Sequence, residues 1–457
     1  MELYFVPFGD AFIVYRPLLP LAFVGNGAMV RHIERRLAGV GGARTAADGY
    51  LDAVGFWDED PPAPAAWDPA APHEPTTAVL LMTSACNLRC TYCYAFGGEG
   101  PVRAMGLPLA LRAVEAAHRN AQRRGEAGWA LVFHGGGEPT ANWDVLVGAT
   151  RRARELPLPC EITMATNGVL SPAKRRFVID HFDGLSLSFD GVERVQNGQR
   201  PTAGGGGSFA AVMSTIRELD AAAFPYGVRI TVTPDAFATL PESVTFVCEN
   251  SRCQGVQVEP AYSGARGAHG EPAPEMARTF IDAFLEAFAV AARAGRTLFY
   301  SGATPWRLTR HFCRAGHDAL VVTPEGDLVT CFEIHDRTHP LFEQFRIGAL
   351  AAGTGARRSL PILGQPPPEP TVDGEALRRF AENERAAQQV CRSCHCYWHC
   401  AGDCATRRAA ARDPGAGGRC QVNRELTAEL LAWYIAAGGG VWRGHGADAV
   451  RPVPAGG

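Results

Sequence analysis

The sequence predicts an α/β fold, in which a parallel sheet carries helices on its faces and is either open or curled into a barrel. Short apolar runs of strand character alternate with helical runs from Thr77 to about residue 299, and this alternation is typical of βαβ units. Polar and glycine-rich motifs directly follow several strands, which is where the active sites of such folds lie. The length of 457 residues suggests about three domains, so we expect further units before and after the sheet.

A small α+β unit is predicted at the start of the chain, over residues 1–58. Apolar patterning indicates a strand pair followed by two helices. These elements are Leu3–Phe8, Ala11–Val24, Ala28–Leu37 and Ala46–Gly55. Residues 59–76 are rich in proline and alanine, so they are expected to form a semi-rigid linker.

The alternating part, residues 77–299, contains six predicted strands. They are Ala78–Met82, Trp129–Phe133, Glu161–Ala165, Leu185–Phe189, Val228–Val232 and Val256–Glu259. Helices are predicted between them, among them Pro108–Arg123 and Phe209–Leu219. In a last helix, an apolar residue recurs every four positions, which predicts a face turned to the core. These residues are Met276, Phe280, Phe284 and Phe288.

Charge and composition exclude several classes of protein. The 44 basic and 47 acidic residues leave a net charge of −3, which argues against a nucleic-acid-binding surface. No apolar run is long enough to span a membrane. The N-terminal residues lack the basic start of a secretory signal, so a cytoplasmic protein is expected. Thiols stay reduced there, and the 14 cysteines are therefore better interpreted as metal or cluster ligands than as disulfides.

The first group of cysteines directly follows the first predicted strand of the sheet. Cys86, Cys90 and Cys93 are spaced so that three thiolates share one short loop. Three such ligands can hold three irons of a [4Fe–4S] cluster and leave the fourth iron open to a small molecule. A structural zinc site is the alternative, but zinc wants four protein ligands, and only the distant His118 or His134 offers a fourth.

This loop resembles the radical S-adenosylmethionine (SAM) superfamily, because an aromatic residue, Tyr92, precedes its last cysteine. Gly135-Gly-Gly-Glu-Pro139 likewise resembles the family's Gly-Gly-Glu-Pro motif. The resemblance implies a partial (β/α)6 barrel, one [4Fe–4S] cluster and bound SAM. It further implies that Gly136, Gly137 and Glu138 bind the amino group of SAM, for which carbonyl and carboxylate acceptors are suited.

Further strand-end residues match the family at positions that help to hold SAM. The resemblance assigns its ribose and methionine parts to Thr166, Asn167, Ser188 and Asp190. It also assigns the SAM carboxylate to an arginine, because a guanidinium binds a carboxylate through two parallel hydrogen bonds. Arg200 is the expected residue, and Arg229 is a competing candidate.

Seven later cysteines resemble the SPASM extension of one branch of radical SAM enzymes, which holds two auxiliary iron–sulfur clusters. They are Cys313, Cys331, Cys391, Cys394, Cys400, Cys404 and Cys420. The resemblance implies a SPASM domain over residues 300–430, followed by a helix end and tail over residues 431–457. The alternative is a zinc site formed by Cys391, Cys394, Cys396, His399 and Cys400.

The resemblance divides these cysteines between two clusters. One would be held by Cys391, Cys394, Cys400 and Cys420, and the other by Cys313, Cys331 and Cys404. The second set lacks a fourth cysteine. Its fourth position would be open to substrate or filled by His317, Asp318 or Cys396.

Relatives with this extension mostly act on peptides or proteins, by forming thioether, ether or carbon–carbon cross-links or by oxidising a residue. The N-terminal unit weakly resembles the peptide-recognition domain of ribosomal-peptide maturation enzymes, although a structural cap on the barrel is an equal alternative. We therefore predict a maturase of a ribosomally made peptide, supplied with electrons by a flavodoxin or ferredoxin. The alternatives are a protein-oxidising maturase of the sulfatase-maturing type and a zinc-stabilised binding protein. Glu333, two residues after Cys331, is a candidate catalytic base.

Overall fold

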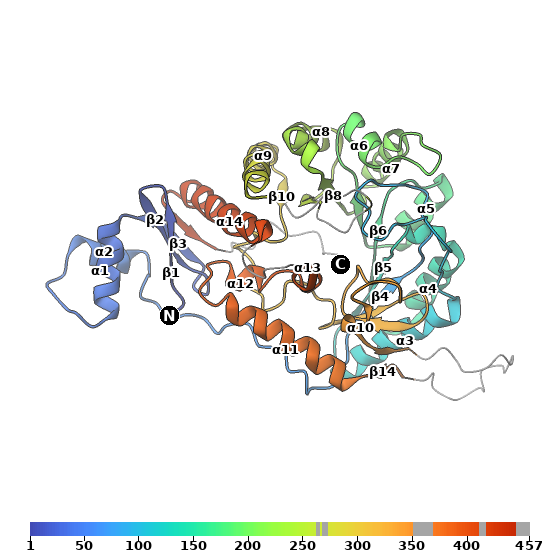
Figure 1. The fold of residues 1–457 in the computed structure, drawn as a ribbon, viewed down its shortest axis with the longest axis horizontal. Coiled ribbons are helices and arrows are strands. Elements are labelled where there is room, and N and C mark those ends of the chain that lie inside the picture. Colours follow the sequence, from blue (N-terminus) through green and yellow to red (C-terminus); the bar gives the residue numbers. More distant parts are fainter. Residues whose placement is uncertain (262–265, 267–272, 351–368, 411–416, 445–457) are drawn as a thin grey trace. The chain divides into compact units, whose positions relative to one another are not determined.

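The computed structural model describes residues 1–261, 266, 273–350, 369–410 and 417–444 (Figure 1). The chain divides into two compact units, each built from separate stretches of sequence. One unit comprises Met1–Trp67, Tyr300–Phe312 and the described part of Arg385–Arg451, and the other comprises Asp68–Phe299 and Cys313–Glu384. None of the helices in the described part of the chain is long and apolar enough to cross a membrane.

The larger unit is built on a sheet whose strands follow the order β10-β9-β8-β7-β6-β5-β4-β11-β12-β13-β14 within the described residues. Neighbouring strands from β4 to β10 are parallel. These strands are β4 (Thr77–Leu81), β5 (Trp129–His134), β6 (Cys160–Thr166), β7 (Gly184–Ser188), β8 (Tyr226–Val232), β9 (Gly255–Pro260) and β10 (Thr297–Phe299). The predicted α/β class with a parallel sheet is therefore confirmed.

Helices connect these parallel strands, because a parallel pair needs a crossover connection. They are α3 (Leu107–Arg124), α4 (Trp143–Glu155), α5 (Pro172–His181), α6 (Glu193–Gln199), α7 (Phe209–Ala221), α8 (Leu240–Asn250) and α9 (Pro274–Arg293). Local signals set their ends: α3 has Pro108 in its first turn and stops at Gly125, whose φ is 66°. The predicted apolar face of α9 is buried at Phe280, Phe284 and Phe288.

The sheet continues beyond β4 into the cysteine-bearing part of the chain. Strand β11 (Ala319–Val322) pairs with β4 in parallel. Strands β12 (Asp327–Val329), β13 (Arg346–Ala349) and β14 (Thr371–Val372) then follow as antiparallel neighbours. The short helix α10 (Phe342–Phe345) precedes β13, and α11 (Gly374–Val390) follows β14.

The smaller unit contains an antiparallel sheet in the order β1-β2-β3-β15. Its strands are β1 (Tyr4–Phe8), β2 (Ala11–Arg16), β3 (Leu21–Gly25) and β15 (Val441–Arg443). Its helices are α1 (Gly27–Leu37), α2 (Ala46–Ala53), α12 (Tyr397–Cys400), α13 (Ala405–Ala410) and α14 (Gly418–Ala437). One core cluster joins the sheet to α14 through Ile13, Tyr15, Leu431 and Trp442.

Residues 431–457 were expected to form only a helix end and a tail, but β15 pairs with β3 along Val441–Arg443. The three glycines Gly438–Gly440 end α14 and turn the chain back. A strand of three residues carries too little periodicity to be recognised from sequence. Its place is decided by pairing with a strand more than 400 positions earlier in the chain.

Candidate functional site

The cysteine loop (residues 83–98) leaves the end of β4 and carries Cys86, Cys90 and Cys93. All three thiols are free and partly exposed. Each sulfur accepts an N–H: Cys86 from the backbone of Leu88 at 3.4 Å and Cys93 from the backbone of Gly97 at 3.3 Å. Cys90 accepts from a side chain, described below. Hydrogen bonds to sulfur are typical of cluster ligands, so the loop fits an iron–sulfur cluster.

The Gly-Gly-Glu segment (residues 135–138) leaves the end of β5 and packs directly on the cysteine loop. The backbone N–H groups of Gly137 and Glu138 donate to the carbonyls of Thr83 and Ala85, both at 2.8 Å. A methyl group added at Gly137 would lie 2.7 Å from the carbonyl carbons of Ser84 and Ala85, closer than carbon atoms approach without repulsion. The position therefore requires glycine because two backbones touch there.

Glu138 is buried and anchors the end of β5 to the end of β6. Its Oε1 accepts from the hydroxyls of Thr140 and Thr166, both at 2.9 Å, and from the Thr140 N–H at 3.2 Å. In the described residues Oε2 accepts one bond, from the Asn167 N–H at 2.8 Å, which leaves it able to accept from an ammonium group. Burial raises the pKa of Glu138.

The other strand-end residues lie on the same edge of the sheet, because parallel strands end together there. Asn167 reaches the cysteine loop: its Nδ2 donates to Asn87 Oδ1 at 2.7 Å and lies 3.7 Å from Cys86 Sγ. Ser188 ends β7, is partly exposed, and its hydroxyl has no partner in the described residues. It is thus free to bond to a ligand.

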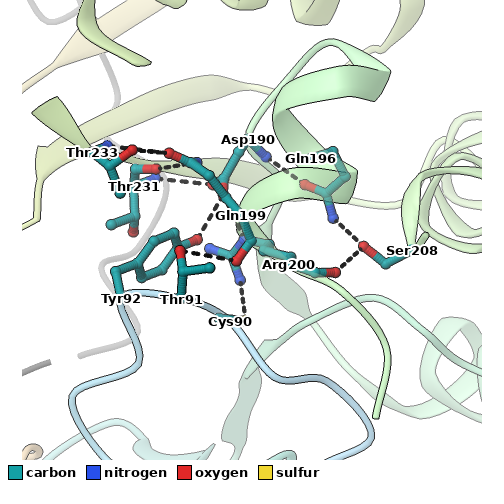
Figure 2. Close-up of polar contacts among 10 residues, drawn as sticks. All are labelled: Cys90, Thr91, Tyr92, Asp190, Gln196, Gln199, Arg200, Ser208, Thr231 and Thr233. Carbon is teal, nitrogen blue, oxygen red and sulfur yellow. Dashed lines mark hydrogen bonds and ion pairs between the residues drawn. The ribbon is translucent and has the colours of Figure 1, made fainter. Parts of the chain in front are cut away.

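Asp190 lies just past β7 and is fully buried. Its Oδ2 accepts from Tyr92 Oη at 2.7 Å, Gln199 Nε2 at 2.8 Å and Arg200 Nε at 2.9 Å, and its Oδ1 accepts from the Thr231 N–H at 3.1 Å (Figure 2). A buried carboxylate needs such partners. Asp190 was expected to contact SAM. In the structure it is the centre of this hydrogen-bond network.

Arg200 was expected to pair with the SAM carboxylate, but it is 5% exposed and forms an ion pair with Asp190. Its guanidinium lies over the ring of Tyr92, 5.1 Å from the centroid, and its Nη1 is 3.9 Å from Cys90 Sγ. Burial raises the pKa of the Cys90 thiol, and the Arg200 charge acts against that rise. Figure 2 shows the side chain between Asp190 and the cysteine loop.

Arg229, the competing candidate, lies on β8 and is exposed. Its side chain has no hydrogen bond or ion pair in the described part of the chain. Its charge acts on two neighbours. Burial and Arg229 lower the pKa of His134 to about 4, and burial raises the pKa of Tyr94 against the effect of Arg229. Arg229 is thus a cation close enough to His134 and Tyr94 for its charge to act on both.

The segment after Cys331 also lies at the Gly-Gly-Glu segment. The ring of Phe332 stacks on His134, with centroids 5.5 Å apart, and Glu333 contributes to the raised pKa of Tyr94, which burial dominates. His335 packs on Gly136, where an added methyl would lie 2.6 Å from the imidazole Cδ2. Sequence reasoning missed His335, because a lone histidine four residues past a cysteine carries no motif.

The remaining ligands expected for the second auxiliary cluster are divided between the two units. Cys313 and Cys331 belong to the larger unit and accept N–H bonds from Ala315 at 3.3 Å and Glu333 at 3.4 Å. Cys404 belongs to the smaller unit. Of the candidates for a fourth ligand, His317 pairs with Glu384 at 2.9 Å, and Asp318 accepts from Arg124 at 3.1 Å.

In the smaller unit, four thiols act on one another. Burial raises the pKa of Cys420 to about 11, with Cys391 and Cys394 adding to the rise. Burial likewise raises the pKa of Cys400, with Cys420 and Cys394 contributing. Asn423 Nδ2 donates to Cys400 Sγ at 3.3 Å. These four cysteines are those expected to hold one auxiliary cluster.

Cys396 lies beside this group. Its sulfur lies 3.4 Å from the Asn423 carbonyl oxygen, and a hydrogen bond between the two side chains lowers the pKa of the Cys394 thiol to about 6. The ligand atoms of Cys394, His395 and Cys396 lie within 4.8 Å of one another. The region is therefore suited to metal, which keeps the zinc alternative open.

Comparisons with known proteins agree with this site. Residues 80–246 match the family model of the Radical SAM superfamily, and no curated protein matches the chain. A structure of native anSMEcpe with bound AdoMet and Kp18Cys peptide is 16% identical, covers 79% of this chain and 99% of its own, and has a TM-score of 0.60. That of Streptococcus suis SuiB bound to S-adenosylmethionine is 12% identical, covers 90% and 96%, and has a TM-score of 0.50.

At these identities the solved structures establish likeness of fold, and the family match rests on the segment that contains the cysteine loop, the Gly-Gly-Glu segment and Asp190. The superfamily uses SAM together with a [4Fe–4S] cluster. The chain is therefore an enzyme whose residues 80–246 form a domain of the radical SAM superfamily.

Proposed function

We propose that this enzyme is a peptide maturase that abstracts hydrogen from a ribosomally made peptide and installs an intramolecular thioether, ether or carbon–carbon cross-link. The observation that carries the proposal is the backbone contact between the cysteine loop, which we propose as the cluster site, and the Gly-Gly-Glu segment, which we propose as the acceptor site for SAM. The peptide seen in the anSMEcpe structure supports a substrate of this class.

Each residue at the sheet edge has a part in this proposal. When bound, the cluster and SAM supply a 5′-deoxyadenosyl radical. Cys86, Cys90 and Cys93 would hold the cluster. The Gly136 and Gly137 backbone and the Glu138 Oε2 would accept hydrogen bonds from the SAM ammonium, because these atoms are acceptors at one edge.

Three further residues would orient SAM beside the cluster. Thr166 fixes the Glu138 carboxylate, and Asn167 ties the end of β6 to the cysteine loop. Ser188 offers a free hydroxyl for the ribose or methionine part. For the SAM carboxylate we favour Arg229, because its guanidinium has no ion pair in the described residues while Arg200 is committed to Asp190.

The substrate carbon would lie between the Gly-Gly-Glu segment and the segment after Cys331. Glu333 and His335 are titratable groups of that segment, and His335 contacts Gly136 and pairs with Asp336 at 3.3 Å. Either residue would accept a proton from the oxidised product. His134 and Phe332, which stack on one another, would cover the site on one side and exclude water.

The two cysteine sets of the C-terminal part would hold auxiliary clusters. Cys391, Cys394, Cys400 and Cys420 would form one, and Cys313, Cys331 and Cys404 the other. These clusters would accept an electron from the product radical or bind the substrate. Cys313 and Cys331 belong to the larger unit and Cys404 to the smaller one.

The N-terminal sheet would bind the leader of the peptide. Strand β1 is the terminal strand of that sheet in the described part of the chain and is only partly buried. An extended peptide can add a strand to such an edge through backbone hydrogen bonds. Pro7, which lacks an N–H, sits within β1, where an edge strand tolerates it.

The test is anaerobic reconstitution with iron and sulfide, followed by reaction with a short peptide encoded beside the gene, reduced flavodoxin or ferredoxin, and SAM. We expect 5′-deoxyadenosine together with a peptide that has lost two hydrogens per cross-link. The Cys90→Ala variant is the control. Intact peptide mass with no 5′-deoxyadenosine refutes the proposal.

Two other outcomes identify the alternatives. A product that reacts with aldehyde reagents and carries no cross-link in its fragmentation spectrum indicates a protein-oxidising maturase. Protein that binds zinc without sulfide and stays colourless indicates a zinc-stabilised binding protein, and it would also remove the basis for any radical chemistry.

A further inference from the structure

The three sulfurs of the cysteine loop differ in the charge of the groups that donate to them. Cys86 and Cys93 face neutral donors, from backbone N–H groups and the Asn167 amide. Cys90 faces the guanidinium of Arg200, with Nη1 3.9 Å from Sγ. Arg200 thus brings a positive charge to one ligand position, where it acts on Cys90 together with Arg266 and against the Asp190 carboxylate.

Two other arginines touch the same loop but bond to its carbonyls. Arg89 donates to the carbonyls of Cys86 at 2.9 Å and Gly98 at 2.7 Å. Arg266 donates to the carbonyls of Cys90 at 2.9 Å and Gly97 at 3.1 Å. These contacts hold the loop in shape. Arg200 differs because its described contact with the loop goes to a sulfur and to the Tyr92 ring.

Contacts with three neighbouring residues hold Arg200 in place. Asp190 accepts from its Nε, Tyr92 lies under its plane, and its own carbonyl accepts from Ser208 Oγ at 2.7 Å (Figure 2). Gln199 and Thr231 hold Asp190 in turn. A side chain fixed on so many sides keeps its charge in place at little entropic cost.

We propose that Arg200 is a positioning residue that raises the reduction potential of the cluster held by Cys86, Cys90 and Cys93. The inference rests on the proposed assignment of that cluster to these cysteines. The reduced cluster carries one more negative charge than the oxidised one, so a fixed cation beside a ligand sulfur stabilises the reduced state more. Hydrogen bonds to sulfur and local charge are among the factors that set such potentials.

Arg200→Gln in the full chain, loaded with clusters and free of SAM, tests the proposal. The readout is the midpoint of the electron paramagnetic resonance signal that the Cys90→Ala variant lacks. We expect the equilibrium constant for one-electron reduction to fall at least tenfold, which is about 59 mV for a single electron. Tyr92→Phe is the matched control, because it removes a donor from Asp190 without changing charge, and we expect less than a threefold change.

Arg200→Lys gives a second measurement. An ammonium group is a compact point charge without the planar fork of a guanidinium, so we expect the equilibrium constant for reduction to fall at least threefold but by less than in Arg200→Gln. If Arg200→Gln does not hold the cluster, Arg200→Lys alone tests the proposal, and a fall of less than threefold contradicts it.

Three results would overturn the inference. An unchanged midpoint in both variants at full cluster content would show that Arg200 has only a structural role. Unchanged potential with more than tenfold weaker SAM binding would make Arg200 the partner of the SAM carboxylate. Wild-type protein without the cluster signal would instead overturn the proposed function, and this inference with it.

Discussion

Gly137→Ala should move the cysteine loop away from the Gly-Gly-Glu segment, the two halves of the proposed SAM site. The added methyl carbon would lie 2.7 Å from the carbonyl carbons of Ser84 and Ala85, whereas carbon atoms prefer about 3.5–4.0 Å. Both carbonyl carbons belong to the backbone and cannot rotate away. The clash is therefore relieved only if the cysteine loop and the Gly-Gly-Glu segment move apart by about 1 Å. A misplacement of this size can cost about a hundredfold in rate. We therefore expect SAM cleavage to fall by roughly that factor.

The same motif supplies graded controls. At Gly136 the added methyl would meet the side chain of His335, at 2.6 Å, and a side chain can rotate away. At Gly135 the nearest atoms are 3.3 Å distant, which a small local shift relieves. The assay is 5′-deoxyadenosine formed per chain, with iron and sulfide measured in parallel. Activity of Gly137→Ala within twofold of wild type, or equal damage from Gly135→Ala, would refute the reasoning.

Three further changes probe other parts of the chain. Cys90→Ala should abolish SAM cleavage and remove about four iron atoms while the auxiliary clusters survive; retained cleavage would contradict the assignment of the loop. Trp442→Ala should lower the free energy of unfolding by about 3–5 kcal/mol, because Trp442 is 7% exposed in the core of the smaller unit. Urea unfolding measures this free energy, and Arg443→Ala is the control because Arg443 is exposed. Burial lowers the pKa of His399 to about 3, so the unfolded chain binds a proton at a higher pH than the folded chain does. The contribution of His399 to the free energy of unfolding is therefore fully present above about pH 6.5 and is lost as the pH falls below that value. In His399→Gln, the free energy of unfolding should therefore fall by about 2 kcal/mol less between pH 7 and pH 5 than it does in the wild type. Equal losses in both proteins would show that His399 is not responsible.

Much of the larger unit was predictable because its signals are local. Strands β4 to β9 are short apolar runs bounded by turns, and the predicted boundaries agree with the observed ones to within two residues. The Cys86–Cys93 spacing and the Gly135–Pro139 run are written in consecutive residues. Their meeting follows from topology, since parallel strands end at one edge.

The partners of individual polar side chains were not predictable. Arg200 was expected to face SAM, yet its nearest carboxylate is Asp190, ten positions away in the sequence. The contact of His335 with Gly136 joins residues about 200 positions apart. Both arrangements depend on how loops pack, and a charged side chain takes whichever partner the packing leaves within reach.

The sequence by itself determined the class of fold, and it predicted the kind of cofactor and the residues that would hold it, because spacing along one loop or strand carries that information. Only the tertiary structure decided that β15 completes the N-terminal sheet, that Gly137 must lack a side chain, and that Arg200 turns to a sulfur. These depend on backbones and charges brought together from distant parts of the chain. Burial then determines which contacts are made, since a buried charge or backbone group must find a partner.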